Sequence, residues 1–400
     1  MKIYTTKNDV ASERKIVADD MILTKDMPTA AGSKMLDGYM SLFDAEVVTR
    51  LCNAGYALCG KADVGEFAID LVGETSYNGV CTADGALTNA CAEIIKSGDA
   101  MAAITLDVNG SVRRGSAQNS LVSIKPTYGT VSRYGTIPVA CSGETVSVMA
   151  QNSDSCREIL DVIAGHDDKD GTSLSDELCA RIKKDADFSP IRRVAVITSL
   201  CDGIDGDVKG KMDAFCNILT KNGVEVTEIE NSVIASSRIA WNILMSAELC
   251  NNVSRYDGVK YGYRSQNFTN IDELYTNSRT EAFGELLKTA ILFGSETLST
   301  DNYMKVYDKA LRTRRVITEE FAKIFASYDA VLIPACSSMK YTENTVKENK
   351  YIAFEENAYT APASISGLPA VTVGGVQLIG NAFSENALLD IAKMYEKEGK

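Results

Sequence analysis

The sequence predicts an α/β protein, with one structural unit over residues 1–400. Helix-like and strand-like segments alternate along the whole chain, which favours helices packed on a sheet over separate all-α or all-β units. No linker rich in Pro, Gly or Ser and no internal repeat interrupts this alternation. At 400 residues the chain is longer than most single cores, so two domains are the alternative. We expect one domain.

The first half of the chain contains three well-marked elements. Residues 44–55 have the apolar spacing of a helix that stops at a glycine, and the strand-like segment YALCGK follows. The apolar run AMAAITL, at residues 100–106, is typical of a buried strand and leads directly into the loop that holds Ser111. Ser155 and Glu158 have the spacing of a capping box at the start of another helix.

The second half predicts a strand, a helix and a strand over residues 192–230. The loop inside this unit, LCDGIDGD, lacks the Gly-x-Gly-x-x-Gly spacing that cradles a pyrophosphate, so we expect no nucleotide there. The remaining elements are helices near residues 236–257 and 307–328, the strand AVLIPA from Ala330, and a final helix over residues 384–398.

Composition excludes several classes of function. The net charge of -13 argues against direct nucleic-acid binding, because phosphate contacts need clustered Lys and Arg. No apolar run reaches about 18 residues, so no membrane span is expected. Eleven scattered cysteines without a Cys-x-x-Cys pair, and a start without an apolar signal segment, indicate a reduced cytoplasmic protein. Since His166 is the only histidine, we expect no metal site, and we expect no cofactor.

Four segments in fixed order carry the most specific signal: GSKML at Gly32, GKADVGEFA at Gly60, SIKPTYGTVSRYG at Ser123 and GLPAVTV at Gly367. Together with TKDMPTAAGSKMLDGY and AGHDDKDGTSL, they resemble the amidase signature family and, within it, the glutaminase-type subunits of tRNA-dependent amidotransferases. The resemblance runs from about Ile16 to the C-terminus. It implies the amidase-signature fold, a large mixed β-sheet core covered by helices on both faces.

The resemblance also implies a reaction. In this family a serine in an Asp-Thr-Gly-Gly-Ser loop attacks a carboxamide, a second serine with a cis peptide bond relays the proton, and a neutral lysine is the base. Backbone N–H groups of the loop stabilise the oxyanion. In the amidotransferases the released ammonia passes to a partner protein, so the resemblance implies a protein partner and a small amide or amino acid as ligand.

Ser111 retains the nucleophile position of that loop. Val108, Asn109 and Gly110 occupy the oxyanion positions before it, with Val108 in place of a hydroxyl side chain and Asn109 in place of a glycine. Because a glycine lets the backbone approach a substrate closely, Asn109 is expected to disturb the oxyanion site.

The two proton-transfer positions are altered. Counting back without a gap from the Thr-Lys landmark at Thr24 places Asp19 at the lysine position, and counting back from Ser111 places Leu87 at the relay serine. A carboxylate is a much weaker base than a neutral amine, and an isobutyl group cannot carry a proton. Thr88 or Cys91 could replace the relay only with a different side-chain direction.

Two further positions concern the substrate. Arg314 matches the arginine that meets the glutamine carboxylate in the amidotransferases, and Asn357 replaces the aspartate that meets the amino group of glutamine. The chain is also shorter than the family before the relay segment and after AVTV at Ala370, and both places flank the expected active-site mouth.

These observations favour an amidase-signature protein whose own amide hydrolysis is impaired or lost, and which acts by binding a partner or a small amide. The alternative is an active amidase or glutaminase, an ammonia-supplying C–N hydrolase that uses Ser111 with a proton relay rebuilt from Asp19, Lys25 or Lys34. A third hypothesis is a structural component of a complex, with an occluded pocket.

Overall fold

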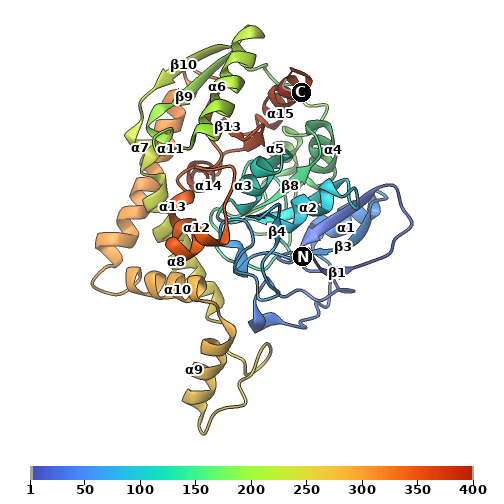
Figure 1. Cartoon of the computed structure of the whole chain (residues 1–400), viewed down its shortest axis with the longest axis vertical. Helices are drawn as coiled ribbons and strands as arrows, with labels where there is room; N and C mark the ends of the chain where they lie inside the picture. Colours follow the sequence, from blue (N-terminus) through green and yellow to red (C-terminus); the bar gives the residue numbers. More distant parts are fainter. Residues whose placement is uncertain (1–2, 399–400) are drawn as a thin grey trace.

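A mixed sheet of eleven strands forms the centre of the protein, described here over residues 3–398 from a computed structural model (Figure 1). The strand order is β1-β3-β2-β6-β8-β7-β12-β13-β11-β9-β10, and β4 and β5 form a separate two-stranded sheet. The strands are β1 (Tyr4–Lys7), β2 (Lys15–Asp19), β3 (Ala57–Ala62), β4 (Thr82–Ala83), β5 (Ala86–Leu87), β6 (Ala102–Asp107), β7 (Val122–Lys125), β8 (Thr145–Ala150), β9 (Arg193–Ile197), β10 (Glu225–Ile229), β11 (Ala330–Pro334), β12 (Ala370–Val373) and β13 (Val376–Gly380).

Helices surround this sheet. They are α1 (Glu46–Asn53), α2 (Ala90–Lys96), α3 (Ser111–Gln118), α4 (Ser153–Ile163), α5 (Asp176–Ala180), α6 (Gly206–Lys221), α7 (Ser232–Ala235), α8 (Ser237–Val253), α9 (Ile271–Ala282), α10 (Glu285–Thr297), α11 (Asp308–Phe325), α12 (Glu343–Glu348), α13 (Ile352–Glu356), α14 (Ala361–Ser366) and α15 (Glu385–Glu398). Short 3-10 turns lie at Lys34–Leu36, Glu66–Ala68 and Thr198–Leu200, and a π turn at Tyr303–Tyr307 precedes α11.

Strand directions explain the mixed character of the sheet. β2 runs parallel to β3 and β6, and β9 runs parallel to β10 and β11. Parallel neighbours need a crossover, which α1 supplies between β2 and β3 and α6 supplies between β9 and β10. The central neighbours β6, β8, β7, β12, β13 and β11 are antiparallel.

Both faces of the sheet are buried, as the period of two along its strands requires. In β2, Ile16 and Ala18 belong to the larger apolar cluster, which includes residues of α1 and α4. Val17, between them, belongs to a second cluster with α2 and with Val112 of α3. Ala103 and Ile104 of β6 divide between the clusters in the same way. The predicted α/β fold, with a large mixed sheet and helices on both faces, is confirmed.

The predicted helices and strands are found with small shifts at their ends, but the capping box at Ser155 is wrong. α4 begins two residues earlier, because the Asn152 side chain caps it by accepting a hydrogen bond from Ser155 N at 2.9 Å. Glu158 accepts hydrogen bonds from Arg14 and Tyr56 instead.

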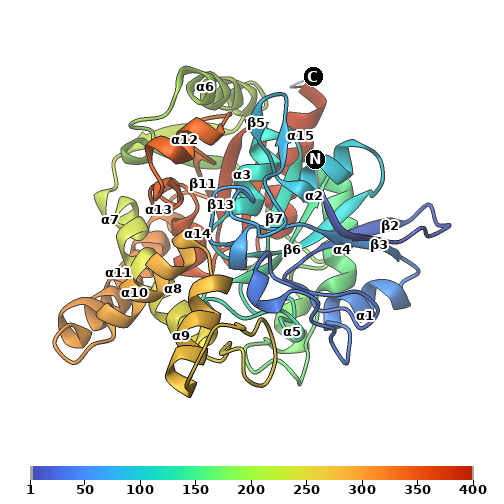
Figure 2. The same ribbon diagram turned by 60° about the horizontal axis from the view of Figure 1, so that its bottom comes forward.

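Helices α8, α10 and α11 pack together beside the sheet, and α9 projects beyond them (Figure 1). Both views place α14 between α3 and these helices (Figure 2). Over residues 3–398, no helix is long and apolar enough to cross a membrane. The single domain over residues 1–400 stays a prediction.

Candidate active site

The loop after β6 has the shape that a nucleophile loop needs. α3 begins at Ser111, directly after Gly110, whose φ of 84° lies in the left-handed region. A Cβ at Gly110 would lie 2.4 Å from the side chain of Thr360, so the position requires glycine. Ser111 is 3% exposed, and no hydrogen bond to its hydroxyl is present within residues 3–398.

An ion pair between Asp107 and Arg113 joins the end of β6 to the first turn of α3. Arg113 donates from Nε to one carboxylate oxygen at 2.7 Å and from Nη2 to the other at 2.9 Å, and both side chains are fully buried. Further donors of Arg113 reach Thr360 O, at 2.8 Å, and Ser364 Oγ, at 2.7 Å. A bidentate pair of this kind fixes the orientation of both groups.

Arg114 is a buried neighbour of the loop whose contacts the sequence did not predict. Its guanidinium donates to Leu71 O at 3.0 Å, to Asp70 O at 2.9 Å and to Thr360 Oγ1 at 3.2 Å. Thr360 Oγ1 in turn donates to Asn109 O at 3.2 Å. The signal available in the sequence was the helical spacing of three residues between Ser111 and Arg114.

Asp19, at the expected lysine position, is the last residue of β2. Its Oδ1 accepts a hydrogen bond from Met21 N at 3.0 Å, and its Oδ2 accepts one from Leu106 N at 2.7 Å. Burial raises the pKa of Asp19 to about 7, although the two N–H donors act in the opposite direction. Among residues 3–398, no hydrogen bond joins Asp19 to Ser111.

A buried lysine lies close to Asp19, and the sequence analysis did not single it out. Lys61 Nζ donates to Thr29 Oγ1 at 2.8 Å and to Ile22 O, and it lies 3.7 Å from Asp20 Oδ1. Burial lowers the pKa of Lys61 and raises that of Asp20 to about 6. The amine therefore faces Asp20 and the turn after β2.

Leu87, at the expected relay position, is the second residue of β5 and is 3% exposed. Its backbone N donates to Tyr341 O at 2.7 Å, and its side chain belongs to the larger apolar cluster. The proposed substitutes point elsewhere: Thr88 Oγ1 donates to Glu93 Oε1 at 2.8 Å, and Cys91 is buried in the second apolar cluster.

The other side chains considered for a rebuilt relay are also engaged away from Ser111. Lys25 Nζ lies 3.8 Å from Asp44 with a side chain 56% exposed, and Lys34 Nζ lies 4.0 Å from the centre of the Tyr263 ring. The His166 ring nitrogens lie 2.8 Å from Leu174 O and 3.0 Å from Asp168 Oδ1.

The structure brings one of the two predicted substrate residues to the loop. Asn357 Nδ2 donates to Asn109 Oδ1 at 2.9 Å, and both side chains are fully buried. Arg314, on α11, donates to Ser142 O at 2.7 Å and to Ser142 Oγ at 3.0 Å. The part of the chain that the structure describes shows no hydrogen bond from Arg314 to the loop.

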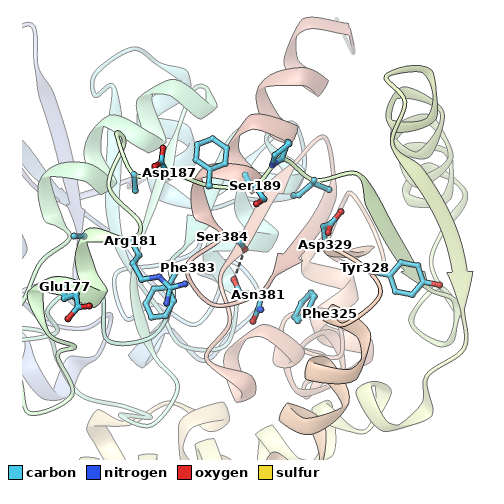
Figure 3. Close-up of a pocket in the computed structure, with 16 residues that line it drawn as sticks. Glu177, Arg181, Asp187, Ser189, Phe325, Tyr328, Asp329, Asn381, Phe383 and Ser384 are labelled. Atoms are coloured by element: carbon cyan, nitrogen blue, oxygen red, sulfur yellow. Dashed lines mark hydrogen bonds between the residues drawn. The ribbon is translucent and has the colours of Figure 1, made fainter.

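Other ligand sites lie away from this loop. No group of three or more His, Cys, Asp or Glu side chains in residues 3–398 is placed to hold a metal ion. A cavity of about 900 Å³ lies between α5, the segment before β9 and the start of α15 (Figure 3). Its lining includes Arg181, Tyr328 and Phe383 but not Ser111.

The fold and the loop together define a protein class with a serine at the start of a buried helix and a mixed sheet behind it. Residues 16–389 match the model of the family described as "Amidase". The chain belongs to the amidase family.

Relatives with curated names agree with this assignment, and all three compared here are the A component of glutamyl-tRNA(Gln) amidotransferase. The chain is 33% identical over 411 aligned residues to that of Coxiella burnetii (strain Dugway 5J108-111), covering 96% of this chain and 83% of the relative. It is 34% identical to that of Acinetobacter baumannii (strain AB0057), covering 94% and 81%. The structure from Thermotoga maritima matches with a TM-score of 0.82 at 25% identity, covering 99% of this chain and 87% of that one.

Proposed function

We propose that this chain is an amidase-family protein whose Ser111-centred amide hydrolysis is impaired or lost, and which acts as a binding protein or as a component of a complex. The observation that carries the proposal is the environment of Asp19. Both of its oxygens already accept backbone N–H bonds, from Met21 at 3.0 Å and from Leu106 at 2.7 Å. A serine nucleophile needs a base within hydrogen-bond reach, directly or through one water.

Leu87 supports the same proposal, because its side chain has neither donor nor acceptor. Loss of a general base typically costs about 10²–10⁴ in rate, and residues that act as a unit are not additive. Ser111 alone is therefore expected to give little turnover.

The partner role is supported by the names of the relatives, which are components of an amidotransferase with more than one chain. A protein that covers 83% of such a relative has room for most of the surface through which the relative assembles. The ligand class that the family suggests is a small amide or an amino acid.

Amide turnover tests the proposal. Glutamine, asparagine and propionamide should be hydrolysed by the full chain no faster than by its Ser111→Ala variant, with ammonia release as the readout. A wild-type rate ten times that of Ser111→Ala, with any of the three amides, would show that hydrolysis survives.

An active amidase or glutaminase is the second candidate. Two observations favour it: the Ser111 hydroxyl is kept without a hydrogen-bond partner in residues 3–398, and burial raises the pKa of Asp19 to about 7, near the value suited to a general base. On this alternative, turnover rises with pH as Asp19 ionises and is lost in both Ser111→Ala and Asp19→Asn.

A further inference from the structure

Three asparagine side chains form a hydrogen-bonded chain beside the Ser111 loop. Asn357, the residue after α13, donates from Nδ2 to Asn109 Oδ1 at 2.9 Å and to Asn242 Oδ1 at 2.6 Å. Asn109 belongs to the loop, and Asn242 belongs to α8. These hydrogen bonds therefore tie the loop, α8 and the end of α13 together.

Backbone carbonyls fix the orientation of all three amides. Asn109 Nδ2 donates to Ile69 O at 2.8 Å, and Asn242 Nδ2 donates to Phe354 O at 2.8 Å. Since a carbonyl only accepts, each of these asparagines must turn its own oxygen toward Asn357. Asn357 must then present its nitrogen to both, and its Oδ1 faces away from them.

The Oδ1 atom of Asn357 is a buried acceptor without a partner in residues 3–398. Leaving such a group unsatisfied has a cost in free energy, which an N–H donor on a bound molecule would recover. The donor that fits is uncharged. Glu356, the neighbouring carboxylate, already accepts hydrogen bonds from Ser337 N at 3.0 Å and from Tyr341, and an ammonium buried without a counter-charge is costly.

The surroundings limit the rest of the ligand. Ser111 is 3% exposed and Asn357 is fully buried, so only a small molecule fits between them. The first-turn N–H groups of α3 have no intrahelical acceptor and can donate to a carbonyl oxygen. Arg314, the cation expected for a carboxylate, donates to Ser142 instead.

We propose that Asn357 is a specificity-determining residue, which selects a small uncharged N–H donor such as a primary carboxamide or urea and rejects α-amino acids. This inference rests on the proposed function, because it concerns the ligand that the Ser111 site binds. It separates glutamine, which carries an ammonium and a carboxylate, from its neutral amide fragment.

Binding to the full chain tests the inference, with propionamide, urea, L-glutamine and propylamine as ligands in calorimetry and thermal-shift measurements. Wild-type protein should bind propionamide at least tenfold more tightly than glutamine or propylamine. Asn357→Ala should weaken propionamide binding about tenfold. Asn251→Ala, at an exposed position on α8, is the control and should leave binding unchanged.

Equal binding of glutamine and propionamide, unchanged propionamide binding in Asn357→Ala, or no binding of any amide would each overturn the inference. If Asn357→Ala does not fold, Asn357→Ser replaces it, since its hydroxyl can still donate to one neighbouring asparagine. Selective binding accompanied by hydrolysis would contradict only the proposed function, whereas absence of both binding and hydrolysis would contradict only the inference.

Discussion

At the residue scale, the chemistry of this protein depends on what Asp19 does in place of an amine. Its carboxylate bonds to Leu106 N, one residue before Asp107, so it contributes to the join between β2 and β6. A side chain held in this way has a structural task at a position where the family resemblance implies a proton acceptor. The proposal of impaired hydrolysis therefore gives Asp19 a measurable effect on stability.

The pH dependence of stability should reveal this effect. Burial raises the pKa of Asp19 to about 7, against about 3.9 in an unfolded chain. The protonated carboxyl then favours the folded state, so its contribution is complete below about pH 4 and is lost as the pH rises to about 7. The free energy of unfolding of wild type minus that of Asp19→Asn should fall by up to about 1.4 kcal/mol per pH unit across this range.

Urea titrations of both proteins at four pH values, spaced evenly from about pH 4 to about pH 7, measure that difference. Using the difference cancels the other carboxylates, Asp20 included, whose pKa burial raises to about 6. A difference that stays constant with pH would mean that Asp19 is ionised throughout, held by its two N–H donors.

Residue positions near the site could be predicted by counting along the chain, but their contacts could not. Asp19 and Leu87 were found from ungapped spacing alone. The Asn109 to Asn357 hydrogen bond joins residues 248 positions apart, and Lys61 reaches Thr29 across 32 positions. Such contacts depend on how the strands are ordered, which no local pattern in one sequence specifies.

At the element scale, the junction of β6 and α3 depends on the buried pair of Asp107 and Arg113. Removing one partner leaves the other charge buried and unpaired, so Arg113→Met should lower the free energy of unfolding by about 3–5 kcal/mol. The double variant Asp107→Leu with Arg113→Met should recover part of this loss, because neither charge is then left alone. Urea unfolding measures all three proteins.

The matched control is the exposed pair of Arg315 and Glu319 on α11, whose side chains are 83% and 55% exposed. Arg315→Met should change stability little, because exposed pairs are screened by solvent. If Arg113→Met were as mild as Arg315→Met, the buried pair would not be what holds the loop.

Local patterns predicted most elements, because apolar spacing is a local property of the sequence. The strand AVLIPA is β11, and the helix expected over residues 384–398 is α15 (Glu385–Glu398). The capping box failed for a reason that is also local. Asn152 offers a cap upstream of the predicted one, and asparagine caps a helix as well as serine does.

At the scale of the whole molecule, the expectation of one domain over residues 1–400 predicts cooperative unfolding. Trp241, the only tryptophan, is 1% exposed on α8, outside the sheet, so its fluorescence reports on the helical part of the chain. Far-ultraviolet circular dichroism reports on all elements. The two signals should give coincident urea transitions. Separate midpoints would show that the helices α8 to α11 unfold as an independent unit.

The central claim is that Ser111 lacks a proton acceptor, and its reactivity toward a fluorophosphonate tests this most directly. Intact mass spectrometry would follow phosphonylation of the full chain, with Ser111→Ala as the blank. We expect wild-type protein to react no faster than this blank, in acidic, neutral and mildly alkaline buffer alike. Rapid labelling, mapped to the peptide that contains Ser111 and absent from Ser111→Ala, would contradict the account.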